Sequence, residues 1–390
     1  MKKYKRTFIV VVAFTCATLV FYAINLASKK GQGPLSATMQ EIESAIIGDS
    51  TQSVNSTDSN QDSLSDFDTV KRVAISVSRN QLKNPQKILM GYSGSTYSSI
   101  TKATHDMDSK LGVRMDLIQI YKAWGSKQSE QFPTDEVKEI VALGSIPLIT
   151  WEPWLSDFSA KIPNQASPEM REVNPLKAIY NGVYDDYIKQ WALDAKRINA
   201  PIYLRFAHEM NDPYRYPWGP HNNDPGDFNK AWIHVHQIFK ELKVQNILWV
   251  WSIHSAYAGY QEYYPGDAYV DIVATGILNF GSSVYWSKWW SFNELFAPHY
   301  NELSSFGKPI IIVEFGSLKV GGNREKWYAQ ALNSIPQTYK NVKGVVFFNF
   351  PADKTLTDKS VSWILDPDKK ETKAIQRILK NWKDSNFLYP

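Results

Sequence analysis

Two glutamates, Glu209 and Glu314, each come directly after a short apolar run of the kind that forms a buried strand. The first run continues as Arg-Phe-Ala-His-Glu-Met-Asn, so Arg205, His208 and Asn211 lie close to Glu209 in the chain. In a barrel of parallel strands, side chains at the carboxyl ends of the strands converge on one open face. Such a fold would bring the two carboxyl groups together although they are far apart in the sequence.

A pair of facing carboxyl groups has the chemistry needed to hydrolyse a glycosidic bond. In the retaining mechanism one protonated carboxyl group donates to the leaving oxygen, while an ionised one about 5 Å away attacks the anomeric carbon. A cation such as Arg205 can hold a carboxylate ionised, and apolar rings raise the pKa of a carboxyl group. The spacing alone does not assign the two roles. For either glutamate taken alone, a structural ion pair at a strand end is the alternative.

The elements that must position these residues alternate between short apolar runs and amphipathic stretches. This alternation predicts a parallel sheet covered by helices, and eight such units predict an α/β fold of the (β/α)8 TIM-barrel type. A doubly wound sheet is the alternative, but Gly91-Tyr92-Ser93-Gly94 is too short to be its phosphate loop. The predicted strands are 87–91, 117–121, 146–151, 202–206, 247–251, 270–275, 310–313 and 345–348, and the predicted helices are 133–143, 184–198, 227–242, 292–306, 324–335 and 370–384.

The amino terminus predicts a membrane anchor. A basic tip, 1–6, precedes an apolar run of the length that spans a bilayer as a helix, so 7–28 is expected to be a single-pass transmembrane signal anchor with the rest outside the cytoplasm. A cleaved signal peptide and secretion is the alternative. The polar, Ser- and Asp-rich segment 29–74 predicts a flexible stalk, which leaves 75–390 as the barrel domain.

Composition excludes some classes of protein. The net charge is only +4 and the basic residues are scattered, so no nucleic-acid partner is expected. The only cysteine, Cys16, excludes an intramolecular disulfide. Aromatic residues make up 14% of the chain, which suits either sugar binding or a large core. His234 and His236 diverge on a predicted helix, so no catalytic metal is expected, and a structural calcium ion in the Asp-rich loops is the alternative. Hydrolysis by two carboxyl groups needs no cofactor.

Several motifs resemble family 26 of the glycoside hydrolases, retaining enzymes of clan A known as β-mannanases with some β-1,3-1,4-glucanases and β-1,3-xylanases. The resemblance spans roughly 82–363 and is carried by LRFAHEMN, VEFG and GSIPLITWEPW. It implies that Glu209 is the acid/base and Glu314 the nucleophile, with Arg205 and His208 in the subsite of the attacked sugar. It further implies sugar contacts, with packing under a loop as the alternative for the rings, for Asn211, Tyr214, Tyr216, Trp218, Trp151, Glu152 and Trp251.

The sequence departs from the mannanase pattern at two places. After the sixth strand it lacks the Asp and Tyr of mannanases, where the Tyr holds the nucleophile, and Asn279 is the nearest polar substitute. The eighth strand ends in Asn349 in place of a sugar-stacking Trp. These departures resemble a subgroup found near exopolysaccharide synthesis enzymes, which makes a β-glucan-like exopolysaccharide a candidate substrate besides β-mannan.

These observations together predict a monomeric retaining endo-β-glycanase, tethered to the cell membrane, with a β-linked polysaccharide as its partner. An inactive, membrane-tethered glycan-binding protein is the alternative from another class.

Overall fold

The computed structural model describes residues 78–94, 99–159, 162–284, 287–354 and 360–388. The predicted basic tip, membrane anchor and stalk lie outside these ranges. Within them, no helix has both the length and the hydrophobicity needed to cross a bilayer.

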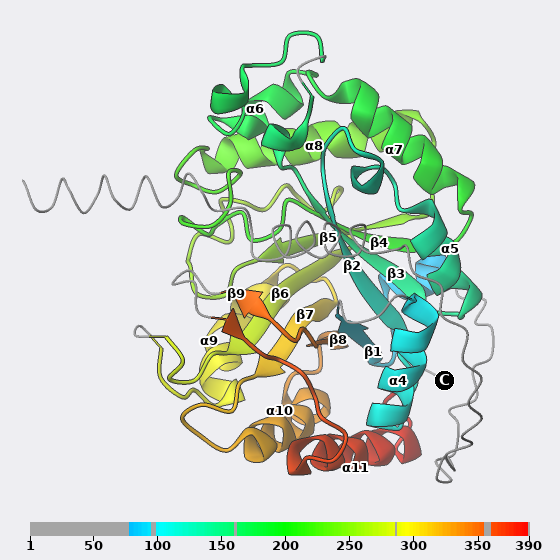
Figure 1. The fold of residues 1–390 in the computed structure, drawn as a ribbon, viewed down its shortest axis with the longest axis vertical. Helices are drawn as coiled ribbons and strands as arrows, with labels where there is room; N and C mark the ends of the chain where they lie inside the picture. The colour runs from blue at the N-terminus through cyan, green and yellow to red at the C-terminus, as the bar shows by residue number, and fades with distance from the viewer. Residues whose placement is uncertain (1–77, 95–98, 160–161, 285–286, 355–359, 389–390) are drawn as a thin grey trace, which may run out of the picture.

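Eight parallel strands form a closed barrel in which each strand pairs with its neighbours in chain order and β8 pairs with β1 (Figure 1). All eight predicted strands are present, and most extend further toward the carboxyl end than predicted. The barrel fold is therefore confirmed. The strands are β1 (Leu89–Ser93), β2 (Leu117–Ala123), β3 (Ile146–Glu152), β4 (Ile202–Phe206), β5 (Ile247–Ile253), β6 (Ile272–Asn279), β7 (Ile310–Ser317) and β8 (Val342–Phe348).

Helices surround the barrel on its outside (Figure 1). All six predicted helices are present; α3, α4 and α6 were not predicted. The connection from β5 to β6, residues 254–271, forms only turns. The α-helices are α3 (Arg79–Lys83), α4 (Ile100–Leu111), α5 (Thr134–Ala142), α6 (Pro175–Tyr180), α7 (Asp185–Arg197), α8 (Pro225–Glu241), α9 (Phe292–Ser305), α10 (Arg324–Thr338) and α11 (Lys370–Asp384). Shorter elements are the 3-10 turns at Gln128–Glu130, Leu155–Asp157 and Pro168–Met170, and the antiparallel pair β9 (Asp353–Lys354) and β10 (Ser360–Val361).

Alternation along each strand separates two apolar layers. In β3, Leu148 belongs to the cluster inside the barrel, whereas Ile149 and Trp151 belong to the larger cluster between the barrel and the helices. Because strand side chains alternate between faces, the residues that share parity with Leu148 point inward. Polar residues that reach the open end of the barrel must therefore follow the inward parity or depend on a local irregularity.

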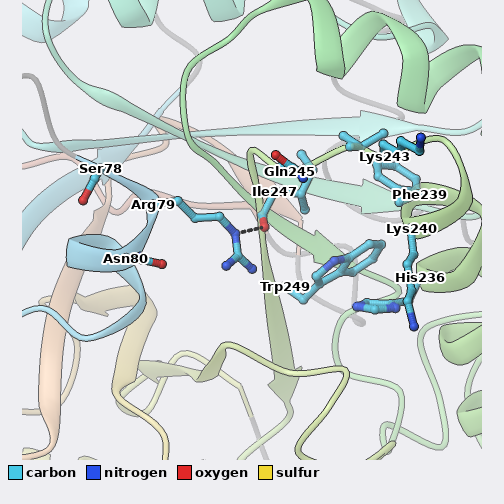
Figure 2. A pocket seen from close by; sticks show the side chains of 11 residues that line it. Ser78, Arg79, Asn80, His236, Phe239, Lys240, Lys243, Gln245, Ile247 and Trp249 are labelled. Atoms are coloured by element: carbon cyan, nitrogen blue, oxygen red, sulfur yellow. Dashed lines mark hydrogen bonds between the residues drawn. The ribbon is translucent and has the colours of Figure 1, made fainter.

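The short helix α3 closes the amino-terminal end of the barrel. Leu82 is completely buried in the interior cluster, and its carbonyl oxygen accepts a hydrogen bond of 2.7 Å from the hydroxyl of Tyr203 in β4. Arg79 donates to the carbonyl oxygen of Ile247, at the start of β5 (Figure 2). It also donates to Asp271. A pocket of about 580 Å³ lies beside α3 at this end of the strands, opposite to the end where Glu209 and Glu314 lie.

Candidate active site

Glu314 faces the mouth of the barrel because β7 is irregular. Ile310 and Ile312 point outward and Ile311 and Val313 inward, so simple alternation would turn Glu314 toward the helices. The register with β6 shifts at this point: Thr275 pairs with Ile312, but Gly276 pairs with Glu314. A bulge of this kind re-aims a side chain. Here it makes Val313 and Glu314 successive inward residues.

Two donors hold the same oxygen of Glu314. The guanidinium of Arg205, fully buried in β4, lies 2.8 Å from Oε1, and the hydroxyl of Tyr121 in β2 lies 2.9 Å from it. Burial alone would raise the pKa of Glu314, but the charge and hydrogen bond of Arg205 and the hydrogen bond of Tyr121 lower it below its usual value. Burial and the nearby Glu314 raise the pKa of Tyr121 well above its usual value, which keeps the phenol protonated as a donor. Glu314 is therefore held ionised.

Glu209 lies beyond the last residue of β4, in a backbone of unusual conformation. Ala207 and Glu209 have φ angles of 43° and 52°, in the left-handed region that residues with a Cβ seldom adopt. The amide of Ala207 donates to the carbonyl oxygen of Trp151 in β3, whereas the amide of Glu209 donates to that of Ser252 in β5. These bonds to both neighbouring strands fix the direction in which Glu209 leaves the barrel wall.

The surroundings of Glu209 favour its protonated form. The residue is 5% exposed, and the guanidinium of Arg215 lies 3.9 Å from its Oε2. Burial and the nearby Glu314 raise the pKa of Glu209 more than His254 and Arg215 lower it. The two glutamates thus have pKa values shifted in opposite directions.

The two carboxyl groups face each other across Gly276 of β6. A Cβ placed on this glycine would lie 3.6 Å from Oε2 of Glu314 and 3.7 Å from Oε1 of Glu209. The two oxygens are therefore no farther apart than the sum of these distances. This bound admits the separation of about 5 Å of retaining glycosidases and excludes the wider part of the inverting range, roughly 6.5–9.5 Å.

His208 is held beside the pair as a neutral imidazole. Its Nε2 lies 3.1 Å from the hydroxyl of Tyr216 and 3.9 Å from Oε1 of Glu152, and its buried Nδ1 has no protein partner. Burial, together with the charges of Arg205 and Arg215, lowers the pKa of His208 well below its usual value. The unpaired Nδ1 remains available to a bound hydroxyl group.

A third carboxyl group, Glu152, ends β3 on the inward face. It is 6% exposed, and burial raises its pKa to about 7 despite the opposing effect of Arg205. A carboxyl group that is partly protonated near neutral pH can donate a hydrogen bond as well as accept one. Glu152 thus lies at the end of the third strand, as the sequence predicted, and the structure places it 3.9 Å from His208.

Three predicted sugar-contacting tryptophans are packing residues, and these predictions are corrected. Trp151 and Trp251 point outward into the layer under the helices and are 0% exposed, so they have no free face for a sugar ring. The indole N–H of Trp251 donates to the carbonyl oxygen of Tyr263, within the turn-rich connection. Trp218, also 0% exposed, donates to the carbonyl oxygen of His208 at 2.7 Å and supports the site from below.

Among the predicted rings of the loop after β4, Tyr214 is the exposed one, at 66%, and it packs edge-on against Tyr257 with ring centroids 6.0 Å apart. Tyr216 is 5% exposed and stacks on Trp218. Tyr214 therefore has a ring surface free to meet a substrate.

The two predicted asparagines bond to the protein. Asn279 is 0% exposed; its Nδ2 donates to Ser317 and its Oδ1 accepts from the amide of Gly281. The expectation that Asn279 replaces the tyrosine that holds the nucleophile is corrected, because Tyr121 makes that bond. The side-chain amide of Asn211 donates hydrogen bonds to the loop after β5, at the carbonyl oxygens of His254 and Tyr257.

One group of possible metal ligands occurs within the described ranges. Ligand atoms of Glu209, Asp212 and His254 all lie within 4.8 Å of one another. Because this group includes Glu209, a cation bound there would compete with the proton that the raised pKa of Glu209 favours.

The chain forms a closed parallel barrel, and two buried carboxyl groups face each other at the carboxyl-terminal end of its strands. It therefore belongs to the class of (β/α)8-barrel proteins with a two-carboxylate site. Residues 158–316 match the family model described as Glycosyl hydrolase family 26. The family resemblance that the motifs indicated is thereby confirmed, and the matched segment is a family 26 sequence.

Two curated proteins are similar in sequence to parts of this chain. Endoglucanase H of Acetivibrio thermocellus is 33% identical over 247 residues, which cover 61% of this chain and 25% of that protein. Mannan endo-1,4-beta-mannosidase of Bacillus subtilis is 24% identical over 199 residues, which cover 45% of this chain and 51% of that protein. The chain thus spans between a quarter and about half of the length of these relatives.

The fold is shared with solved structures. A β-mannanase of Bacteroides ovatus superposes with a TM-score of 0.56 at 15% identity, over 79% of this chain and 92% of that one. At such low identity the superposition shows a common fold.

Proposed function

We propose that this chain is a retaining endo-β-glycanase in which Glu209 is the acid/base and Glu314 the nucleophile. The observation that carries the proposal is the pair of facing carboxyl groups whose pKa values are shifted in opposite directions. Environments that separate two carboxyl groups in this way assign the roles of acid and nucleophile.

Glu209 and Glu314 each act in both steps of the proposed reaction. The Glu314 carboxylate attacks the anomeric carbon, the glycosidic C–O bond breaks, and Glu209 gives its proton to the leaving oxygen. Glu209, now ionised, then takes a proton from a water molecule whose oxygen attacks the same carbon and releases Glu314. Arg205 and Tyr121 hold the nucleophile ionised, and His208 and Glu152 contact the attacked sugar.

The proposed substrate is a neutral β-linked polysaccharide: β-mannan, or a β-1,4 or β-1,3-1,4 glucan-like exopolysaccharide. The similarity to an endoglucanase and to a mannan endo-1,4-beta-mannosidase supports this class of polymer. The exposed ring of Tyr214, five residues after the acid/base in the chain, supports a site that is open to solvent and past which a polymer can extend.

We further propose that 7–28 tethers the protein to the cell membrane, that 29–74 is a stalk, and that the barrel domain acts as a monomer outside the cytoplasm. The basic tip and the apolar run that follows it support this arrangement.

The test compares the full chain with Glu209→Ala, Glu314→Ala and a control, Glu302→Ala, whose carboxyl group is exposed on α9. New reducing ends are measured on β-mannan, mixed-linkage glucan and β-1,4-glucan. We expect the first two substitutions to lower turnover by several orders of magnitude, a loss of about 5 kcal/mol or more of transition-state stabilisation, and the control to leave it unchanged.

Azide separates the two roles, because it attacks a glycosyl intermediate without needing a general base. We expect it to rescue Glu209→Ala, with a glycosyl azide of retained configuration as product, but not Glu314→Ala. Near-native turnover of either alanine variant would refute the assignment. Binding of a polymer by the unsubstituted chain without new reducing ends would favour an inactive glycan-binding protein.

A further inference from the structure

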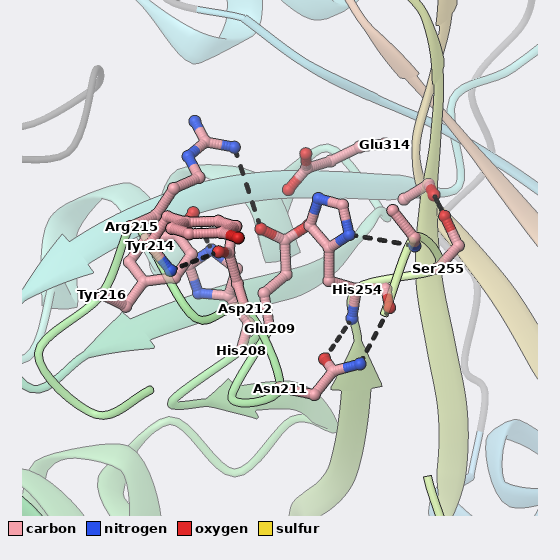
Figure 3. Close-up of polar contacts among 12 residues, drawn as sticks. His208, Glu209, Asn211, Asp212, Tyr214, Arg215, Tyr216, His254, Ser255 and Glu314 are labelled. Atoms are coloured by element: carbon pink, nitrogen blue, oxygen red, sulfur yellow. Dashed lines mark hydrogen bonds and ion pairs between the residues drawn. The ribbon is translucent and has the colours of Figure 1, made fainter. Parts of the chain in front are cut away.

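His254 lies directly beside the acid/base glutamate although it is remote from the HEMN motif in the chain. It begins the loop after β5 and is half-buried. One of its two ring nitrogens lies within 4.8 Å of a carboxylate oxygen of Glu209 and of a carboxylate oxygen of Asp212. In Figure 3 the imidazole ring lies beside the Glu209 carboxyl group, and the Glu314 carboxyl group lies above both.

The local backbone fixes which nitrogen of His254 carries the proton. Its Nδ1 accepts a hydrogen bond of 3.1 Å from the amide of Ala256. A ring nitrogen that accepts carries no hydrogen, so the neutral imidazole has its proton on Nε2. The other ring nitrogen is thereby made a donor.

Asn211 holds the backbone of His254 in place (Figure 3). Its Nδ2 lies 2.9 Å from the carbonyl oxygen of His254, and its Oδ1 accepts from the amide of His254 at 2.8 Å. The asparagine two residues after Glu209 thus ties the loop that carries His254 to the loop that carries the acid/base. The orientation of the imidazole is set by the protein before any substrate binds.

Several charged groups face Glu209 from the elements packed around it. Glu314 approaches from β7, and Arg205 lies in β4 beneath it. The loop after β4 contributes Arg215, 3.9 Å away, Asp212 and the hydroxyl group of Tyr216. Tyr257 faces it from the loop after β5.

These groups have opposing effects. Burial and Glu314 raise the pKa of Glu209, whereas His254, Arg215 and Arg205 lower it, and His254 is the strongest of the three.

We propose that His254 is a positioning residue for Glu209: Nε2–H, the one donor of the neutral ring, stabilises the ionised Glu209 that takes the proton from water in the second step. The proposal rests on the function proposed above, because it gives Glu209 two protonation states in each cycle. Burial and the Glu314 charge favour the acid form of Glu209, and the Nε2–H donor keeps the base form accessible.

The first test is the pH dependence of kcat/KM for the full chain and three variants. Glu209 must be protonated in the free enzyme, so its pKa sets the alkaline limb. Removing a donor to the ionised form raises that pKa, so we expect His254→Ala to move the alkaline limb to higher pH and to leave the acidic limb in place. His254→Gln, which keeps a neutral N–H of similar reach, should move the limb back toward that of the unsubstituted chain.

The control is His105→Ala, which removes an exposed imidazole on α4 and should leave both limbs unchanged. An alkaline limb that stays in place in His254→Ala, or that moves equally in His254→Gln, would overturn the proposal. Thermal unfolding of each variant shows that the barrel is folded. If His254→Ala does not fold, His254→Leu against His254→Gln makes the same comparison.

A second measurement does not depend on activity. The Glu209 carboxyl group is titrated by carbon-13 NMR of the full chain labelled at glutamate side chains, with Glu209→Gln identifying its signal. A higher midpoint in His254→Ala is the expected result, and an unchanged midpoint contradicts it. If the midpoint shifts but no polymer is cleaved, the proposed function fails while the link between His254 and Glu209 stands. If polymer is cleaved and the midpoint is unchanged, the proposed function stands and the link between His254 and Glu209 fails.

Discussion

Tyr121 holds the ionised glutamate from a strand that carries no other sign of function. Its hydroxyl donates to Oε1 of Glu314 and in turn accepts from Nε2 of Gln119 at 2.8 Å. A hydrogen bond to a charged, buried acceptor contributes about 1.5–3 kcal/mol. Tyr121 and Arg205 together therefore decide how much of Glu314 is ionised at a given pH.

We expect Tyr121→Phe to lower kcat/KM about 10- to 100-fold, the equivalent of one charged hydrogen bond. The donor lowers the pKa of Glu314, and activity is lost as pH falls through that pKa. Removing the donor raises the pKa, so the acidic limb of the pH profile should move to higher pH. Tyr203→Phe is the matched control, since that hydroxyl bonds to Leu82 at the closed end of the barrel. Equal profiles for the two variants would contradict the role of Tyr121.

The two glutamates at strand ends could be predicted from the sequence. The residues that surround them could be predicted only in part. HEMN and VEFG mark Glu209 and Glu314 because each follows an apolar strand. Tyr121 gives no such signal, since a tyrosine in a strand is an ordinary core residue. The outward direction of Trp151 was predictable, because it shares the parity of Ile149 and not that of Glu152.

At the scale of elements, β6 and β7 together shape the space between the carboxyl groups. The bulge in β7 turns Glu314 inward, and the residue opposite to it in β6 is Gly276. The absence of a side chain at this position leaves room between the two carboxyl groups. Neither feature has a signature in a single sequence, because register depends on pairing across strands that are distant in the chain.

Gly276→Ala should separate activity from stability. The added methyl would meet its neighbours at 3.5 Å or more, an ordinary contact distance, so we expect the free energy of unfolding to change by less than about 1 kcal/mol. The methyl would occupy the space between the carboxyl groups, and displacing a sugar by about 1 Å costs on the order of 100-fold in rate. Urea unfolding and kcat/KM measure the two effects. Gly226→Ala, whose Cβ has no neighbour within 4 Å, is the control, and unchanged catalysis in Gly276→Ala would count against this geometry.

Elements with long apolar runs were predictable, whereas helices with narrow stripes were not. All eight strands were found from continuous apolar residues, although their boundaries shift by up to four residues. The helix α4 buries Ala103, Met107 and Leu111 in an otherwise polar segment, a stripe too narrow to stand out. The connection from β5 to β6 replaces a helix with turns around Trp251 and Tyr263, which no local pattern specifies.

For the molecule as a whole, the prediction concerns attachment. After fractionation of cells that express the full chain, we expect the protein in the membrane fraction, resistant to an alkaline wash and released by detergent. Deleting 7–28 should move it to the soluble fraction, because that run supplies the apolar surface that a bilayer buries. Deleting 29–74 is the control and should leave it membrane-bound. A soluble full-length product, or one shortened at its amino terminus, would contradict the tether and favour a cleaved signal.

The position of α3 distinguishes the closed end of the barrel from the end that carries the carboxyl pair. The chain enters the described fold at Ser78, where α3 seals the end of the barrel at which strands begin, and the carboxyl pair opens at the end where they finish. Under the proposed tether, the attachment would reach the domain at the end of the barrel opposite to the carboxyl pair. A long, insoluble or surface-bound glycan could then reach the carboxyl pair from the end of the barrel that is remote from the protein's attachment. The length of the barrel, rather than that of a loop, would hold the proposed active site away from the attachment.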